Sequence, residues 1–224
     1  MVLCINPFAT FSATQPQNAT VLGYVFDNFE LLDLFGPLEL FTFVPGLQIR
    51  LVSANGRPVR SRGGVVVKAD YSFASAPANP DIFLIPGGDG TWLTANSTKH
   101  VNFVKKIAAG TKKTTLSVCT GAAMLARAGV LDGKRATTNK AAFKYVMESS
   151  KKTNWVYHAR WVEDGNVVSS AGVSAGIDAA AQVIKRNWGD AAAQLSVRYA
   201  EYVWNTDSTK DDFSGLYPDP TKGN

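Results

Sequence analysis

Short apolar, β-branched runs alternate with segments of helical spacing along almost the whole chain, and this alternation constrains the fold most strongly. The runs ATVLGYVF (19–26), DIFLI (81–85) and TTLSV (114–118) are apolar at nearly every position rather than at every second one. Strands with that pattern are buried on both faces, as in parallel sheets covered by helices. The pattern predicts an α/β fold with a mostly parallel central sheet and helices on both faces.

The segments between these runs complete the predicted order of elements. Gly36-Pro37 is expected to interrupt the first helix early, and Asp-Gly at 164–165 is typical of a hairpin turn. We predict helices at 31–44, 100–110, 121–131 and 140–149, and two more within 174–203 that are separated near Gly189. Further strands are predicted at 47–54 and 135–139. Edge-strand or hairpin material is predicted at 63–73, and a hairpin at 155–172.

The chain of 224 residues is long enough for one large domain, and it shows neither a repeat nor a linker. Residues 1–20 have no basic residue before their apolar stretch, so they resemble an extension more than a secretory signal. We expect the domain to span 21–204, followed by a polar, peripheral tail at 205–224. No apolar run is long enough to span a bilayer, so no membrane partner is expected.

The net charge of +5 is mild, and the basic residues are scattered. The densest group, Lys105, Lys106, Lys112 and Lys113, fits a solvated helix face better than a nucleic-acid patch, so no nucleic-acid partner is expected. Two histidines and two cysteines without metal-ligand spacing predict no metal site. Cys4 lies in the extension, so Cys119 is expected to be a free thiol in a reducing, cytoplasmic setting.

Ligands of such sheets bind beyond the carboxyl ends of the strands. Three polar segments reach that edge: Asp33 after the first strand, Pro86-Gly87-Gly88 after DIFLI, and Cys119-Thr120 after TTLSV. At Cys119 a strand passes directly into a helix, whose N-terminal N–H groups and dipole favour a thiolate. The candidate nucleophile competes with a second interpretation, a buried and inert cysteine.

Asp33 stands among leucines in ELLDLFGP, where an unpaired acid is costly to bury. It is either a carboxyl that exchanges protons at the active edge or the N-cap of the helix before Gly36-Pro37. Glu30 is the competing carboxylate. The N–H groups of Gly88 and Thr120 are candidates to bind a negative charge developing near Cys119, and the alternative for Gly88 is a simple turn.

These motifs together resemble the DJ-1/PfpI superfamily over residues 21–202, which is most of the chain, and within it the isonitrile (isocyanide) hydratases. The resemblance rests on LDLFGPLELF (32–41), IPGGDGT (85–91), SVCTG (117–121), AGVLDGKRATT (128–138) and HARWVEDGNVVSSAGVSAGID (158–178), which follow in the family's order. It implies a flavodoxin-like, class I glutamine amidotransferase-like sheet and a homodimer. It also implies an enzyme without a cofactor that acts on a small molecule.

Carried onto this chain, the resemblance makes Cys119 the nucleophile, Asp33 the general acid/base and Thr120 its neighbour in catalysis, with Gly88 as a backbone donor. Asn139 stands where many relatives have His, which argues against a Cys–His dyad. Further pocket candidates are Glu30, Trp92, Ala171 and Gly172.

The activity expected from this resemblance is the hydration of an isonitrile to an N-substituted formamide. The alternatives are a glyoxalase III-type or other small-molecule enzyme that uses the same cysteine, and a redox-sensing stress protein.

Overall fold

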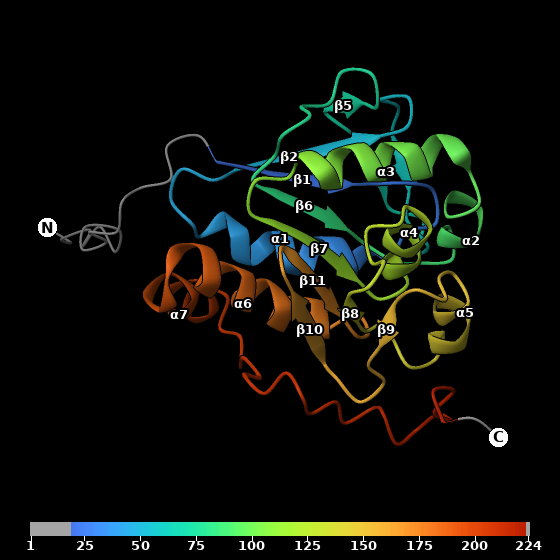
Figure 1. Cartoon of the computed structure of the whole chain (residues 1–224). Coiled ribbons are helices and arrows are strands. Elements are labelled where there is room, and N and C mark those ends of the chain that lie inside the picture. The colour runs from blue at the N-terminus through green and yellow to red at the C-terminus, as the bar shows by residue number, and fades with distance from the viewer. Residues whose placement is uncertain (1–18, 223–224) are drawn as a thin grey trace, which may run out of the picture.

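The continuously apolar runs become the central strands of a sheet (Figure 1). Within residues 19–222, which the computed structural model describes, this sheet has seven strands. Their order is β10 (Trp161–Asp164), β11 (Val167–Ser170), β7 (Thr114–Val118), β6 (Ile82–Ile85), β1 (Thr20–Tyr24), β2 (Gln48–Ser53) and β5 (Tyr71–Ser72). Neighbours run parallel from β11 to β5, and β10 pairs antiparallel with β11 at one edge. The predicted mostly parallel sheet is confirmed.

Helices cover both faces of this sheet, which explains why its central strands are apolar at every position (Figure 1). One face carries α1 (Leu31–Thr42), α6 (Ala175–Trp188) and α7 (Asp190–Tyr199), and the other carries α3 (Thr98–Gly110) and α4 (Gly121–Arg127). The short helices α2 (Thr91–Thr94) and α5 (Phe143–Met147) contact α4. Two small ribbons pair β3 (Val59–Arg60) with β4 (Val66–Val67) and β8 (Arg135–Ala136) with β9 (Asn154–Trp155).

The strand order brings the three candidate segments together. β6 lies between β1 and β7, with Leu84 paired to Gly23 on one side and to Leu116 on the other. Because the three strands run parallel, their carboxyl ends meet at one edge of the sheet. The turn after β6 therefore separates Asp33, at the start of α1, from Cys119, which follows β7.

The expected interruption at Gly36-Pro37 is wrong, because α1 continues through both residues. A helix tolerates an internal proline at a loss of one backbone hydrogen bond, since Pro37 has no N–H for the Asp33 carbonyl. Gly36 has a packing reason. A Cβ at this position would lie 2.8 Å from Cγ1 of Ile177, so the glycine allows α1 to approach α6 closely.

Other predicted elements are confirmed with different bounds. The hairpin of β10 and β11 and the separation of α6 from α7 at Gly189 occur as expected, with Gly189 at a φ of +92°. The helix predicted at 121–131 ends at Arg127, and the strand predicted at 135–139 is reduced to β8, outside the main sheet. Of the predicted edge material, β5 joins the main sheet and β4 pairs with β3.

The expected peripheral tail follows the outside of the molecule, but it is anchored to the domain (Figure 1). The Asp211 carboxylate lies 2.7 Å from the Lys140 ammonium group, and both side chains are buried. The Tyr157 hydroxyl donates to the Tyr217 carbonyl at 2.7 Å. Residues 1–18, most of the predicted extension and the site of Cys4, lie outside the described residues.

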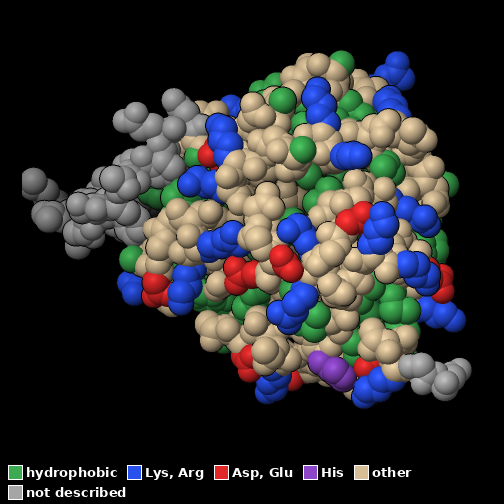
Figure 2. Space-filling model, viewed as in Figure 1, with side chains coloured by type: hydrophobic (Ala, Val, Ile, Leu, Met, Phe, Trp, Pro, Cys, Tyr) green, Lys and Arg blue, Asp and Glu red, His purple; other side chains and the backbone are tan. Residues whose placement is uncertain are grey.

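On the face shown in Figure 2, lysine and arginine side chains are interspersed with acidic ones rather than gathered into one patch. Lys105 and Lys106 lie on the exposed side of α3, as expected of a solvated helix face. In residues 19–222 we find no helix with both the length and the apolar character needed to cross a membrane.

Candidate active site

Cys119 occupies the sharp turn between β7 and α4 with a φ of +56°. This left-handed backbone is uncommon for a residue with a side chain, and such conformations cluster at functional sites. The turn is held from both sides, because the Cys119 N–H donates to the Ala171 carbonyl at 3.0 Å and the Thr138 hydroxyl donates to the Cys119 carbonyl at 2.7 Å. The sequence pattern predicts this turn, and the structure confirms the turn itself.

The Cys119 side chain lies in a nearly closed environment, with 8% of the residue exposed. Burial, followed by the charge of Asp33, raises the pKa of the thiol well above its ordinary value, and hydrogen bonds from Thr120 only partly offset this. The expectation of an ionised sulfur at rest is therefore wrong. The sulfur is a neutral thiol, because desolvation outweighs the helix N-terminus, and any nucleophilic step must remove its proton as it proceeds.

Asp33 is fully buried in the first turn of α1. The pKa of its carboxyl is raised to about 7, chiefly by burial and to a smaller extent by the charge of Glu30. Hydrogen bonds from the Gly87 N–H and with Cys119 lower this pKa and only partly offset the burial. Oδ2 accepts the Gly87 N–H at 2.8 Å, whereas Oδ1 is buried with no hydrogen-bond partner within residues 19–222. The N-cap position belongs to Glu30, so the capping interpretation of Asp33 is wrong.

The turn after β6 lies between the carboxyl and the cysteine turn. A Cβ at Gly87 would lie 3.0 Å from Asp33 Oδ2 and 2.5 Å from Thr120 Oγ1, so only glycine fits there. Gly88 has a φ of +121°, and its N–H donates to Thr120 Oγ1 at 2.9 Å. Both N–H groups of the turn thus bind acceptors of the protein itself, and the role of Gly88 as an oxyanion donor stays a prediction.

Two threonines complete the site and were missed as functional residues in the sequence. Thr91 Oγ1 donates to the Gly88 carbonyl at 2.7 Å and lies 3.1 Å from Thr120 Oγ1. Thr138 binds the Cys119 carbonyl, as described above. Thr91 ends the motif IPGGDGT and Thr138 ends the motif AGVLDGKRATT, so membership of these motifs was the sequence signal that could have identified them.

Three further residues that the sequence suggested for the pocket are Glu30, Ala171 and Trp92, and each has a different environment. Glu30 lies 3.6 Å from the Arg62 guanidinium, and its charge raises the pKa of both Asp33 and Cys119. Ala171 is buried and supplies the carbonyl that holds Cys119. Trp92 is half exposed on α2 and packs against Tyr145.

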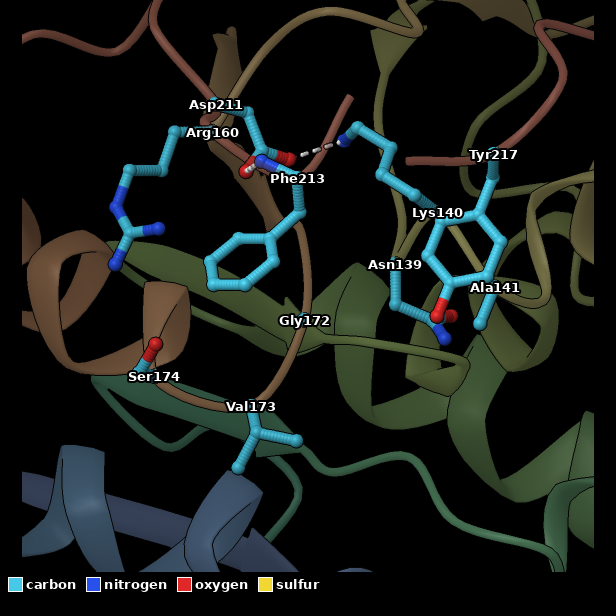
Figure 3. A pocket seen from close by; sticks show the side chains of 10 residues that line it. All are labelled: Asn139, Lys140, Ala141, Arg160, Gly172, Val173, Ser174, Asp211, Phe213 and Tyr217. Carbon is cyan, nitrogen blue, oxygen red and sulfur yellow. Dashed lines mark hydrogen bonds and ion pairs between the residues drawn. The ribbon is translucent and has the colours of Figure 1, made fainter. Parts of the chain in front are cut away.

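Asn139 and Gly172 line a cavity of about 240 Å³ (Figure 3). Its lining comes from four parts of the chain: Asn139, Lys140 and Ala141; Arg160 before β10; Gly172, Val173 and Ser174 after β11; and Asp211, Phe213 and Tyr217 of the C-terminal segment. Cys119 does not line this cavity, although Asn139 and Gly172 directly follow the two residues that hold its backbone.

Metal ligation finds no support in residues 19–222, which contain no group of three or more His, Cys, Asp or Glu side chains arranged to hold an ion. The groups described at this edge are one thiol, one carboxyl whose pKa is raised to about 7, hydroxyl groups and backbone N–H groups.

The fold and the site define a class of α/β protein that carries a cysteine at a strand-to-helix turn beside a buried carboxyl. The chain belongs to the DJ-1/PfpI family, whose family model matches residues 19–186. An isonitrile hydratase of Pseudomonas putida is 32% identical over 83% of this chain and 79% of its own length. A deglycase of Thermococcus kodakarensis is 30% identical over 64% of this chain and 84% of its own.

The solved structures agree on the architecture. A ThiJ/PfpI family protein from Pseudomonas syringae superposes with a TM-score of 0.77 at 26% identity, covering 87% of this chain and 79% of the other. The family resemblance read from the motifs is confirmed. The relatives named above include enzymes of more than one activity, so the reaction of this chain has to be argued from its site.

Proposed function

We propose that this protein is a cofactor-independent enzyme that adds water to an isonitrile and releases an N-substituted formamide. The observation that carries the proposal is the Asp33 carboxyl, which is buried beside Cys119 and has a pKa raised to about 7. A carboxyl with that pKa can both accept and deliver a proton near neutral pH. The similarity to the isonitrile hydratase of Pseudomonas putida supports this substrate class.

In the first step Cys119 adds to the terminal carbon of R–N≡C. Because the thiol is neutral at rest, ionised Asp33 takes its proton as sulfur attacks and delivers that proton to the isonitrile carbon. The product is a thioimidate, R–N=CH–S–Cys119, which contains all atoms of the isonitrile and the thiol. The unpartnered Oδ1 of Asp33 is the oxygen available to carry the proton.

In the second step water adds to the thioimidate carbon while Asp33 accepts one of its protons. Asp33 passes this proton to the thioimidate nitrogen, which gives the tetrahedral adduct R–NH–CH(OH)–S–Cys119. The carbon–sulfur bond then breaks as the hydroxyl becomes the carbonyl, its proton returns to sulfur through Asp33, and R–NH–CHO leaves. Thr120, with its N–H and hydroxyl beside the sulfur, supports the negative charge that sulfur carries as it departs. The cycle consumes one water and needs neither a metal nor an organic cofactor.

Formamide release from aliphatic and aromatic isonitriles tests the proposal directly. Cys119→Ala should lower kcat/KM by at least about a thousandfold, because no covalent intermediate forms. Asp33→Asn should lower it by about 10²–10⁴-fold, because proton transfer is lost while the Gly87 hydrogen bond can remain. Full activity in Cys119→Ala would rule out the mechanism, and wild-type protein inactive on every isonitrile would rule out the function.

The deglycase among the relatives favours a second candidate, a glyoxalase III-type conversion of a small 2-oxoaldehyde to a hydroxy acid. Asn139 stands where many relatives have the His that could move protons in that reaction, so we rank it second. Lactate formed from methylglyoxal, without turnover of isonitriles, would replace the first proposal by the second. A redox-sensing role is weaker, because burial raises the pKa of the Cys119 thiol, and oxidation by peroxide proceeds through the thiolate.

We also propose that the protein acts as a cytoplasmic homodimer. Leu32 and Phe35 are 43% and 40% exposed on α1, beside the first turn that carries Asp33, and they line an apolar groove with Ile177. A second copy that covers this groove would bury both side chains. Sedimentation equilibrium should give twice the chain mass for the wild type, and Leu32→Glu should shift it toward the monomer, whereas a monomeric wild type would contradict the proposal.

A further inference from the structure

The cavity of Figure 3 has no task in the mechanism above, yet it adjoins the cysteine turn. Asn139 follows Thr138, whose hydroxyl binds the Cys119 carbonyl, and Gly172 follows Ala171, whose carbonyl binds the Cys119 N–H. The two segments also approach each other, since a Cβ on Gly172 would lie 3.6 Å from the Asn139 Cβ. Two peptide segments thus serve both as supports of the nucleophile and as walls of the cavity.

The charged groups of the cavity are already neutralised. Lys140 Nζ lies 2.7 Å from the Asp211 carboxylate and donates to the Ala159 carbonyl at 3.0 Å. Arg160 binds Asp178 Oδ2 through both Nε and Nη2, each at 2.6 Å. Each cation therefore has its own carboxylate, and a charged ligand group would lose hydration without gaining an unpaired partner.

The surfaces left for a ligand are mainly apolar. Figure 3 shows the rings of Phe213 and Tyr217 standing over the cavity from the C-terminal segment, with Val173 on the opposite side. Phe213 is 53% exposed and Tyr217 is 46% exposed, so both rings have apolar surface left for a ligand to cover. A ligand between these rings and Val173 would bury apolar surface on both sides. The Asn139 amide and the Ser174 hydroxyl supply neutral hydrogen-bonding groups.

The wall that carries the two rings has a fixed position. Two contacts join the C-terminal segment to the rest of the domain. The buried Asp211 carboxylate pairs with Lys140, and the Tyr157 hydroxyl donates to the Tyr217 carbonyl at 2.7 Å. The cavity volume of about 240 Å³ lies below the range of about 300–1,000 Å³ typical of drug-sized ligands, so it suits one ring rather than several.

From this arrangement we propose that the cavity binds the substituent of the substrate and selects neutral, apolar groups of single-ring size. Phe213 and Tyr217 are then the specificity-determining residues. The proposal rests on the proposed function for the identity of the reacting group, an isonitrile, and adds the chemistry of the part that does not react.

The test compares kcat/KM for benzyl isonitrile, methyl isonitrile and the isocyanoacetate anion. Wild-type protein should prefer the benzyl compound over both others. Phe213→Ala and Tyr217→Ala should each lower the benzyl-to-methyl ratio by about tenfold or more, because they remove contacts to the ring only. Ala141→Phe should lower the same ratio by filling the cavity from the opposite segment.

Leu216→Ala is the matched control, because Leu216 is 68% exposed in the same segment and does not line the cavity. It should leave the ratio within about twofold of the wild type. Turnover of methyl isonitrile reports that each variant is folded. A benzyl-to-methyl ratio that stays at the wild-type value in Phe213→Ala, Tyr217→Ala and Ala141→Phe would overturn the role of the cavity. A wild-type preference for isocyanoacetate would overturn it too. In both cases the proposed function would stand.

A binding measurement distinguishes a failure of the proposed function from a failure of the ligand-binding role of the cavity. If the wild type turns over no isonitrile, the proposed function fails, and calorimetric titration with N-benzylformamide then examines the cavity alone. Saturable binding that weakens at least about tenfold in Phe213→Ala, but not in Leu216→Ala, would support a cavity for neutral ring-bearing ligands. Absence of binding to the wild type would overturn the inference as well.

Discussion

At the scale of single residues, the site is governed by desolvation. Asp33 and Cys119 are both buried. Burial and the charge of Asp33 raise the pKa of the Cys119 thiol, whereas hydrogen bonding with Cys119 lowers the pKa of the Asp33 carboxyl, so a negative charge on this pair near neutral pH is on the carboxyl. The lower pKa belongs to the carboxyl. The proton of the resting pair is therefore on sulfur, and in the proposed mechanism it moves to oxygen as a substrate carbon accepts the sulfur electron pair.

The raised pKa of Asp33 predicts a pH-dependent stability. In the unfolded chain this carboxyl titrates near 3.8, and in the folded protein near 7. Between these values the folded state binds more protons, so its stability falls as the pH rises through this window and stays lowered above it. Asp33→Asn, which cannot ionise, should stabilise the protein relative to the wild type more at pH 8 than at pH 5, with a difference of roughly a few kcal/mol in the free energy of unfolding and a correspondingly larger rise in Tm at pH 8.

Thermal unfolding at the two pH values measures this difference. Asp212→Asn, at a carboxyl that is 72% exposed, serves as the control and should not show it. An Asp33→Asn effect of equal size at both pH values would contradict the assignment of a raised pKa to Asp33.

The site residues that the sequence identifies are those with a signal in their immediate neighbours along the chain. Cys119 follows directly from a strand that meets a helix, and Asp33 is noticeable because leucines surround it. The protonation state of the thiol could not be predicted, because it depends on how completely α1 and the turn after β6 cover the sulfur. The contacts of Thr91 and Thr138 also join segments that are far apart in the chain.

At the scale of elements, β6 and its turn set the spacing between the two reactive groups. The turn places Gly87 against Asp33 on one side and Thr120 on the other. α4 then packs closely on the end of β6, because Gly121 lacks a side chain: a Cβ there would overlap the Ile85 carbonyl oxygen and lie 2.8 Å from that of Pro86. The glycine at this position thus allows close contact between α4 and the end of β6.

Gly121→Ala should therefore destabilise the protein by about 1–3 kcal/mol, although alanine is the better helix former, because neither backbone oxygen can move aside freely. Gly63→Ala is the control, since a Cβ at Gly63 meets nothing within 4 Å. Denaturant unfolding of the two variants gives the comparison. Equal midpoints for Gly121→Ala and the wild type would show that the turn relaxes more easily than its packing indicates.

The elements that the sequence predicts well are those with a strong local pattern, such as the central strands and the β10–β11 hairpin with Asp-Gly at its turn. The first helix was expected to be interrupted early at Gly36-Pro37, because proline lacks an N–H and is tolerated mainly near the first turn of a helix. Its glycine is instead explained by Ile177, which belongs to a helix much later in the chain. No local window around Gly36 contains that contact.

At the scale of the whole molecule, the segment after α7 is part of the domain surface. Removing the Asp211 carboxylate would leave the Lys140 ammonium buried without its counter-ion, although two carbonyl groups still accept from it. Asp211→Asn should destabilise the protein by about 3–5 kcal/mol. The double variant Lys140→Met/Asp211→Leu should recover most of this loss, since it removes both charges.

Thermal unfolding of the single and double variants measures the coupling, and a double variant no more stable than Asp211→Asn would contradict it. This anchor was not predictable from sequence, because a polar stretch with glycine and proline is typical of a loose tail. Only the fold places Lys140 and Asp211 together.

The position of Asp211, Phe213 and Tyr217 after the last helix has a consequence for biosynthesis. During translation the sheet, the cysteine turn and the Asp33 carboxyl are complete on the nascent polypeptide before these residues leave the ribosomal tunnel. A chain cut by a protease ahead of Asp211 would keep Asp33 and Cys119, but it would lose the buried counter-ion of Lys140 together with Phe213 and Tyr217. Under the proposed function, such a fragment would be both less stable and less selective than the intact chain.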